Sequence, residues 1–404
     1  MRPTVVVLAS TYPRWPNDPE PAFVHELSRR LARDHEVIAV VPDAPGADPS
    51  GDLDGVQVVR YRYAPRAWQT LVNDGGIATH LRRSPWKWLL VPGFVLGQYL
   101  AARRVLKRHH VAVIHAHWLI PQGWLAQWLA RPRRIPVLVT SHGGDLFGFR
   151  GRWLTGIKRS VAAACSRMTV VSDAMRKETI RLGLRPPSLA VLPMGVDLQQ
   201  RYVPDPLVSR SADELLFVGR LVPKKGLPHL LDAMPAVLAV RPGVRLAIAG
   251  FGPDRESLEA QASRLGVAHA VRFLGAVAQD RLPDLYRRAS LFVAPFVRDE
   301  SGNQEGLPVV LMEAIGCGCP AIVGEVAGLD DLLGEHGAEV MIDPTDHEAL
   351  ASAILESLEQ PSVALARAAA IRDAATRRVD WDVIAQGYRL ELQACMKGHE
   401  GVRR

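Results

Sequence analysis

The chain has 404 residues, a length that suffices for two domains that each bury a core of their own. Its residues are 48% hydrophobic and 23% charged, as is usual for a globular enzyme, and they carry a formal net charge of +7 at pH 7. The four cysteines lack the paired spacing of a zinc site, so we expect reduced thiols in a cytoplasmic protein.

Apolar, β-branched runs alternate with helical patterns along the whole chain, which predicts parallel sheets flanked by helices. The first run follows Met1 directly, without the charged-then-apolar leader of a secreted protein. In chain order, strands are expected at 4–9, 36–41, 56–60, 111–116, 136–140, 168–171, 189–192, 214–218, 244–249, 271–274, 291–294, 320–323 and 338–341. Helices are expected at 22–33, 225–240, 254–265, 346–358 and 382–396, the last after a possible N-cap at Asp380. Two such series predict two Rossmann-like domains with a cleft between them.

The first half of the chain is the basic half. Residues 1–200 carry 27 Lys and Arg against 14 Asp and Glu, whereas residues 201–404 carry 22 against 28. No nucleic-acid recognition motif or aromatic stacking platform accompanies this charge, so nucleic acid is not an expected partner. An anionic membrane surface fits better, because tryptophans lie among the basic residues.

The most apolar stretch, residues 88–102, lies between basic clusters. It is shorter than the roughly 20 residues that a membrane-spanning helix needs, so no spanning helix is expected. Its flanks favour a helix lying in the headgroup region, which would make the protein peripheral on the inner face of the membrane. The alternative is an interior helix with solvated ends. The flanking residues are Arg82, Arg83, Trp86, Lys87, Trp88, Arg103, Arg104, Lys107 and Arg108.

The segment LLFVGRLVPKKGLPHLLDAM combines a buried strand, a basic turn and the start of a helix. Arg220 and Lys225 lie five residues apart on its turn. The Arg220 guanidinium and the Lys225 ammonium can therefore bind the same diphosphate. The guanidinium can donate two parallel hydrogen bonds, and the ammonium acts as a point charge. A solvated basic turn is the alternative for this loop taken alone.

The run EGLPVVLME carries two acids, Glu305 and Glu313, eight residues apart at a loop-to-helix junction. Eight residues on a helix is a little over two turns, so both carboxylates can face one cleft. Gly306 permits close backbone approach and Pro308 suits a first helical turn, whose free N–H groups attract a phosphate. Together these features indicate a nucleotide-sugar site, and the alternative is an amphipathic helix with two solvated glutamates.

The basic loop and the acid pair about 85 residues later resemble the retaining glycosyltransferases of family 4, which have the GT-B fold. The resemblance covers nearly the whole chain. It includes the ordered matches HAHW (115–118), TSHGGD (140–145), VLPMGVD (191–197), AIAGFGP (247–253) and RFLGAV (272–277). It implies an α/β chain with an acceptor domain at 1–200, a linker at 201–212, a donor domain at 213–380 and, at 381–404, a helix that crosses back onto the first domain.

The resemblance also assigns roles to individual residues. The diphosphate is expected to contact Arg220, Lys225 and the backbone N–H groups near Gly306 and Leu307. Glu305 is expected to hold hydroxyls of the donor sugar, and Glu313 to accept from the ribose. His142 is expected to contact the donor sugar, and the alternative is a loop histidine that caps a backbone group. His117 ends a strand nearby, where a structural histidine is an equal alternative.

The loop after the first strand departs from the family pattern. Many members carry adjacent glycines there, but this loop, STYPRWPNDPEPAFVHEL, has none. It resembles a YPR-type variant within the same family, so loss of activity does not follow. Its residues Tyr12 and Arg14 are expected on the acceptor side, together with His117.

No metal and no other cofactor is expected. Two Asp-x-Asp pairs, at 52–54 and 380–382, match a metal pattern of a different transferase fold, but neither is expected to end a buried strand. The predicted activity is transfer of a hexose from a UDP- or GDP-linked sugar to a cell-envelope, lipid-linked or polysaccharide acceptor, with retention of configuration. Two alternatives remain: a sugar-nucleotide 2-epimerase of the same architecture, and a non-catalytic sugar-nucleotide-binding partner in a biosynthetic complex.

Overall fold

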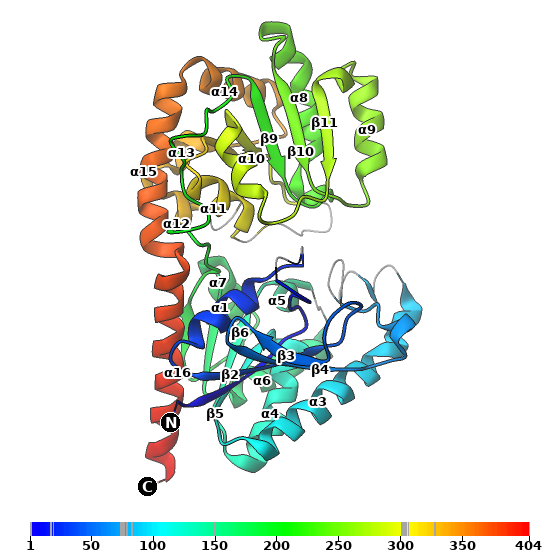
Figure 1. The fold of residues 1–404 in the computed structure, drawn as a ribbon, viewed down its shortest axis with the longest axis vertical. Coiled ribbons are helices and arrows are strands. Elements are labelled where there is room, and N and C mark those ends of the chain that lie inside the picture. Colours follow the sequence, from blue (N-terminus) through cyan, green and yellow to red (C-terminus); the bar gives the residue numbers. More distant parts are fainter. Residues whose placement is uncertain are drawn as a thin grey trace. The chain divides into compact units, whose positions relative to one another are not determined.

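The computed structural model describes residues 2–16, 18, 20–72, 77, 80–81, 84–148, 151–299, 305, 307–326 and 329–403, with the backbone alone at 330, 331 and 399–403. The chain forms two compact units, each built around its own sheet (Figure 1). Unit 1 contains Met1–Pro193 and Ile384–Arg404, and unit 2 contains Met194–Val383.

Unit 1 is built on an eight-stranded sheet in the order β3-β4-β2-β1-β5-β6-β7-β8. Its strands are β1 (Thr4–Leu8), β2 (Glu36–Pro42), β3 (Ser50–Leu53), β4 (Val56–Tyr61), β5 (Val111–His117), β6 (Val137–Ser141), β7 (Arg167–Val170) and β8 (Leu189–Val191). Its helices include α1 (Phe23–Leu31), α3 (Val91–Arg108), α4 (Trp124–Ala130), α5 (Gly144–Gly148), α6 (Arg152–Ala164) and α7 (Asp173–Arg181). The strands expected in this half are confirmed to within a residue or two.

β3 was not among the expected strands, and it contains Asp52 of the first Asp-x-Asp pair. It pairs antiparallel with β4 through a turn at Asp54 and Gly55, which have φ of 52° and 79°. Two central residues with positive φ suit the twist of a tight hairpin, and Asp-Gly is the dipeptide that favours it. Asp52 also accepts a hydrogen bond from the Gly55 backbone N–H at 3.0 Å. The turn chemistry was present in the sequence, but the strand is too short and polar to show a pattern.

Unit 2 is built on a six-stranded parallel sheet in the order β11-β10-β9-β12-β13-β14. Its strands are β9 (Glu214–Val218), β10 (Arg245–Ala249), β11 (Val271–Gly275), β12 (Leu291–Ala294), β13 (Ala321–Gly324) and β14 (Met341–Ile342). Its helices are α8 (Leu227–Val240), α9 (Arg255–Arg264), α10 (Leu282–Arg288), α11 (Val309–Gly316), α12 (Asp330–Leu333), α13 (Gly337–Val340), α14 (His347–Glu359) and α15 (Pro361–Val379). One apolar cluster joins the sheet to α10, α11 and α15, and another joins it to α8, α9 and α14.

The expected strand at 338–341 is wrong for most of its length. Residues 337–340 form the helical turn α13, and only Met341 and Ile342 pair with β13. On α13, Glu339 forms an ion pair with Arg367 of α15 at 2.8 Å. This contact between distant segments favours the helical turn, and local sequence could not reveal it.

The segment 201–212, expected as a linker, packs within unit 2. Tyr202 is buried, and the Arg210 guanidinium donates to the backbone carbonyls of Tyr286 and Ala289 at 2.9 and 2.6 Å. The terminal helix α16 (Trp381–Arg403) begins in unit 2, where Asp380 accepts from the Asp382 N–H at 2.9 Å.

Most of α16 belongs to unit 1. There Arg389 pairs with Asp34 at 2.6 Å, and Glu391 pairs with Arg167. The ring of Tyr388 is fully buried in the same unit.

The helical segment Pro85–Arg108 is 24 residues long and apolar enough to span a bilayer by length and composition alone, which the shorter stretch 88–102 did not suggest. Its inner face packs on the sheet of unit 1, where the Gln98 amide donates to the carbonyls of Ala9 and Val40 at 3.2 Å. Gly97 lies so close to Arg62 that an added Cβ would be 2.8 Å from its carbonyl oxygen. These contacts are those of a helix in a globular domain.

Candidate functional site

The basic loop of unit 2 is held against the strand end of β12. Gly226, which closes the loop, has a φ of 66°, and an added Cβ would lie 1.6 Å from the Pro295 carbonyl oxygen. The Val297 N–H also donates to the Lys224 carbonyl at 3.0 Å. Only glycine fits this close approach. The loop therefore presents its side chains at the carboxyl end of the parallel sheet, where ligands of α/β proteins bind.

The structure brings Glu305 to this basic loop. Its Oε1 lies 2.9 Å from Lys224 Nζ and 3.4 Å from Lys225 Nζ. Lys225 is only 9% exposed, and its ammonium lies 4.7 Å from the centre of the Phe296 ring. The sequence predicted Lys225 and Glu305 for one site, but it did not predict Lys224, although Lys224 is the adjacent residue.

The charges of this cluster act on one another. Burial lowers the pKa of Lys225, and the nearby Glu305 partly offsets that effect. For Glu305, burial raises the pKa, but Lys225 and Lys224 together outweigh it and hold the pKa below its usual value. Glu305 is therefore ionised at neutral pH. Arg220 adds a further cation, and its Nε is buried without a hydrogen-bond partner among the described residues. Two lysines contact the one carboxylate, and the charge of Arg220 acts on Lys225, so the cluster has net positive charge for an anion.

Glu313 occupies a different environment from Glu305. It lies inside α11, it is 5% exposed, and it accepts a hydrogen bond from the Tyr286 hydroxyl at 3.0 Å. Burial raises its pKa to about 7. The two acids were expected to face one cleft, but Glu313 is directed into the interior of unit 2.

The start of α11 differs slightly from expectation. Pro308 occupies the N-cap position rather than the first turn, and the helix begins at Val309. Leu307 is half-buried and packs against the apolar core of unit 2. Gly306 lies outside the described residues.

In unit 1, His117 and His142 meet at the ends of β5 and β6. His117 Nδ1 lies 2.9 Å from His142 Nε2, within hydrogen-bond distance. The turn that follows is fixed by the buried carboxylate of Asp145, which accepts from the Leu119 N–H at 2.6 Å and the Ser141 hydroxyl at 2.9 Å. Asp145 belongs to the TSHGGD motif, but its positioning role was not predicted.

Both histidines are neutral at physiological pH. Burial lowers the pKa of His142 to about 3, and it lowers that of His117 well below its usual value. The hydrogen bond between the two rings therefore carries a single proton. Within the part of the chain that the structure describes, His142 Nδ1 is buried and has no hydrogen-bond partner. That nitrogen lacks the hydrogen-bond partner that buried polar groups usually have.

Two aromatic rings stand beside His142. The centres of the Phe23 and Trp118 rings each lie 4.9 Å from the centre of the His142 ring. Trp118 has a φ of 76°, a strained conformation for a bulky residue, and such strain is concentrated at functional sites. Phe23 was not predicted, because nothing in a single phenylalanine at a helix start distinguishes it from a core residue.

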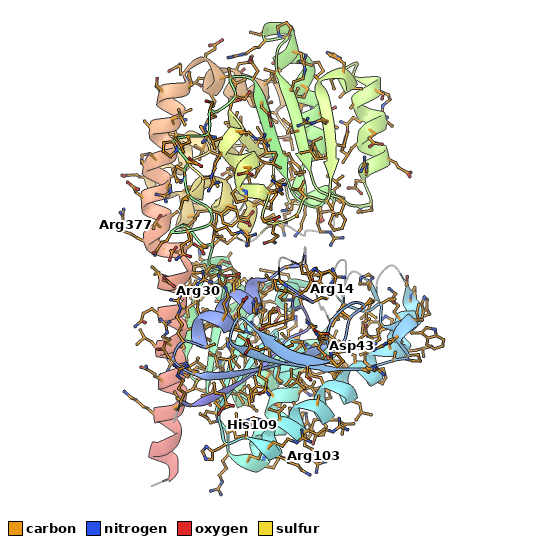
Figure 2. All side chains as sticks on the ribbon, viewed as in Figure 1. Arg14, Arg30, Asp43, Arg103, His109 and Arg377 are labelled. Atoms are coloured by element: carbon orange, nitrogen blue, oxygen red, sulfur yellow. The ribbon has the colours of Figure 1, made fainter. Side chains whose placement is uncertain are left out.

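Of the three residues expected on the acceptor side, the two in the loop after β1 have partners within unit 1. Tyr12 is 5% exposed, and its hydroxyl lies 3.0 Å from Nδ1 of His25, whose other ring nitrogen lies 2.8 Å from Asp54. Arg14, which is labelled in Figure 2, forms an ion pair with Asp18 at 2.6 Å. In the described conformation Tyr12 packs the loop onto unit 1, while Arg14 remains partly exposed.

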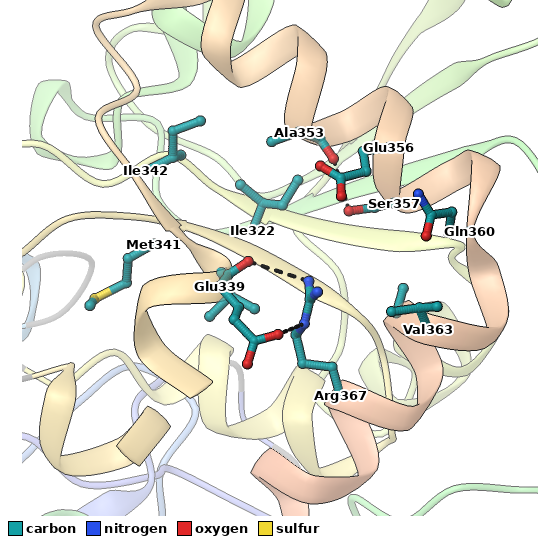
Figure 3. A pocket seen from close by; sticks show the side chains of 12 residues that line it. Ile322, Glu339, Met341, Ile342, Ala353, Glu356, Ser357, Gln360, Val363 and Arg367 are labelled. Carbon is teal, nitrogen blue, oxygen red and sulfur yellow. Dashed lines mark hydrogen bonds and ion pairs between the residues drawn. The ribbon is translucent and has the colours of Figure 1, made fainter. Parts of the chain in front are cut away.

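A hollow elsewhere in unit 2 does not match the predicted site. It lies beside β14, between α13, α14 and α15, with the Glu339–Arg367 ion pair at its wall (Figure 3). Its volume of about 80 Å³ is too small for a sugar nucleotide. None of the predicted site residues lines it.

Two family models match the chain. Residues 22–200 match "Glycosyltransferase Family 4", and residues 204–378 match "Glycosyl transferases group 1". A D-inositol 3-phosphate glycosyltransferase of Geodermatophilus obscurus is 31% identical over 83% of this chain and 77% of its own length. A glycogen synthase of Mycobacterium tuberculosis is 28% identical over 90% of this chain and 87% of its own length.

Solved structures share the fold. Sucrose-phosphate synthase of Thermosynechococcus elongatus superimposes with a TM-score of 0.74 at 19% identity, covering 97% of this chain and 100% of that one. Anabaena HepE, solved with UDP and glucose, gives a TM-score of 0.70 at 18% identity, with the same coverage. The two parallel-sheet units thus have the GT-B architecture, and the chain belongs to the family 4 glycosyltransferases.

Proposed function

We propose that this glycosyltransferase moves a hexose from a UDP- or GDP-linked sugar to a cell-envelope, lipid-linked or polysaccharide acceptor, with retention of the anomeric configuration and without a metal ion. One observation carries the proposal: Lys224 and Lys225 converge on Glu305 at the carboxyl end of the unit 2 sheet. The lysines suit a diphosphate and the carboxylate suits sugar hydroxyls, so their proximity supports the proposal. Named relatives that use GDP-mannose, and one solved with UDP-glucose, support the donor class.

The charges of the cluster suit the reaction. When the bond between the anomeric carbon and the phosphate oxygen breaks, the electron pair leaves with the diphosphate. Fixed cations aimed at that oxygen stabilise the transition state more than the ground state. In the proposal, Arg220 and Lys225 take this role, together with the backbone N–H groups near Gly306 and Leu307.

The acceptor hydroxyl forms the new bond to the anomeric carbon, and its proton passes to an oxygen of the departing phosphate. His142 is a poor base because its pKa is lowered to about 3. We therefore assign it a hydrogen bond to the donor sugar rather than proton abstraction. Glu305 holds the sugar hydroxyls. Glu313 is not given the ribose-binding role that the resemblance implied, because its carboxylate is buried and accepts from Tyr286 inside unit 2.

Product analysis tests this proposal against its alternatives. The purified protein, given UDP- or GDP-sugars, should release the nucleoside diphosphate in amounts that rise with added acceptor. NMR should show the α configuration of the donor in the new linkage. A 2-epimerase would change the sugar or release it without an acceptor, and a binding protein would retain the donor unchanged. An inverted linkage would contradict the retaining mechanism.

We further propose that unit 1 binds an anionic membrane surface through the start of its α3 segment, so that a lipid-linked acceptor is reached from the cytoplasmic face. In the 3-10 turn Pro85–Leu90, Trp86 and Trp88 are 52% and 55% exposed, and Leu89 is 81% exposed. Further along, Arg103 and Arg104 are exposed on α3, as Figure 2 shows for Arg103. Exposed aromatic and basic side chains together suit the headgroup region.

Lys87 does not belong to that surface. It was expected beside the tryptophans as a membrane-facing cation, but its Nζ donates to the Thr70 carbonyl at 2.8 Å and it is 9% exposed. The 3-10 turn places it opposite the two flanking tryptophans. Arg82 and Arg83 lie outside the described residues.

Vesicle co-sedimentation tests the membrane proposal. Binding should require anionic lipid, weaken with salt, and fall when Trp88 and Leu89 are both changed to Ser. Each basic residue near such a surface contributes about 1 kcal/mol, so Arg103→Glu with Arg104→Glu should weaken binding further. Leu207→Ser in unit 2, where the leucine is 92% exposed, is the matched control. Equal recovery with neutral and anionic vesicles would overturn the proposal.

A further inference from the structure

Two histidines and an aspartate converge on the side of unit 2 where α8 meets α14. His229 and Asp232 lie three residues apart on α8 and so share one face of that helix. His347 is the first residue of α14. Helix packing fixes the relative position of the two elements, because Leu230 of α8 and Leu350 of α14 are fully buried in one apolar cluster.

The distances among the three side chains match those of metal ligands. His229 Nδ1 lies 3.1 Å from His347 Nε2, which lies 3.8 Å from an oxygen of Asp232. All three potential ligand atoms fall within 4.8 Å of one another. Ligands about 2.0–2.1 Å from a tetrahedral ion are separated from one another by about 3.4 Å. Small side-chain movements would therefore suffice to place an ion at equal distance from all three.

A neighbouring side chain orients the carboxylate. The Gln261 amide of α9 donates to Asp232 Oδ1 at 2.8 Å and to the Pro228 carbonyl at 3.0 Å. This leaves Asp232 Oδ2 directed toward His347. Such outer hydrogen bonds are typical of metal sites, where they fix ligand orientation.

We propose that His229, Asp232 and His347 bind a divalent transition-metal ion of the zinc class, with water completing the coordination. Two imidazoles and one carboxylate suit zinc, nickel or cobalt, whereas magnesium and calcium require mainly oxygen ligands. All three residues are partly exposed, so an ion can enter from solvent. The ion links the first two turns of α8 to the first turn of α14. It is structural, and no step of the transfer reaction passes through it.

The experiment uses the full chain after treatment with a chelator. Titration with zinc, followed by calorimetry, should show one equivalent bound, and the melting temperature should rise with zinc concentration. Cobalt should give the visible absorption of a site with nitrogen and oxygen ligands. His347→Gln and Asp232→Asn should abolish both signals. Gln261→Leu should weaken zinc binding about tenfold, because it leaves all three ligands in place and removes the hydrogen bond that orients Asp232.

The control is His269→Gln, which changes an exposed histidine of the same unit and should leave binding intact. His347 is 38% exposed, so its replacement should not prevent folding, and the melting temperature without metal checks this. Failure of the chain to bind zinc would overturn the proposal. So would undiminished zinc binding by a folded His347→Gln variant.

Discussion

Lys224 Nζ lies 2.9 Å from Glu305 Oε1, and this ion pair joins two segments that are 81 residues apart in the chain. Glu305 thus pairs with Lys224 and Lys225, and both lysines could also bind a diphosphate. The carboxylate therefore competes with the phosphate for the lysines while it is placed to hold the donor sugar. Variants of the two sides of the pair should behave differently.

Removing a cation should weaken binding of the nucleoside diphosphate. A charge-assisted contact contributes about 1.5–3 kcal/mol, so Lys225→Ala or Arg220→Ala should lower UDP or GDP affinity roughly ten- to a hundredfold. Calorimetry with the free diphosphate is the measurement. Arg264→Gln, at an exposed arginine on α9, is the control. Unchanged affinity in both site variants would remove them from the diphosphate site.

Glu305→Gln should have the opposite effect on the free nucleotide. Its affinity should be equal or tighter, because the competing carboxylate is gone, whereas turnover of the sugar nucleotide should fall sharply. The comparison is calorimetry with the diphosphate beside steady-state kinetics with the donor. A loss of diphosphate affinity as large as that of Lys225→Ala would contradict the assigned roles.

Stability should depend on pH through Glu313. Burial raises its folded pKa from the ordinary value of 4.5 to about 7, so between these values the folded state binds more protons than the unfolded state. The contribution of Glu313 to stability is thus full below pH 4.5 and is lost as the pH rises toward 7. The difference between the folded and unfolded pKa values corresponds to about 3 kcal/mol in the free energy of unfolding.

As the pH rises from 4.5 to 8, the free energy of unfolding of Glu313→Gln should therefore increase by about 3 kcal/mol relative to that of the native protein. Denaturant unfolding of both proteins across this range measures the difference. The exposed Glu359→Gln is the control. A constant difference between the native protein and Glu313→Gln would show that folding does not raise the pKa of Glu313.

Glu313 also shows which parts of the site could not be predicted from local sequence. The basic loop and the parallel strands were predictable, because β-branched runs, Gly226 and adjacent lysines are local signals. The interior environment of Glu313 was not, since Tyr286 reaches it from a different helix. The buried position of the Lys87 side chain could not be predicted either, because it depends on the 3-10 helix and on the hydrogen bond to the Thr70 carbonyl.

Chelation should show separately whether transfer needs a metal ion and whether a metal ion stabilises the fold. Because the basic loop supplies cations to the diphosphate, transfer should survive EDTA at a temperature well below the melting point. The melting temperature should nevertheless fall if zinc occupies the site of His229, Asp232 and His347. Activity assays and thermal melts on the same samples measure both. Loss of turnover in EDTA that magnesium restores would contradict metal independence.

The last prediction concerns the hydrogen bond between His117 and His142. If His117 holds the His142 ring so that Nδ1 meets the donor sugar, then His117→Leu should lower kcat with little change in KM for the donor. His117→Asn should recover part of the loss, because its amide can occupy the position of Nδ1.

A double-mutant cycle distinguishes this positioning role from a merely structural one. His142→Ala should have the largest single effect, and adding His117→Leu to it should cost nothing further, because the partner that His117 positions is already absent. Melting temperatures of all variants show whether folding is affected. If the two losses multiply, His117 acts independently of His142, and its hydrogen bond is not what orients the ring.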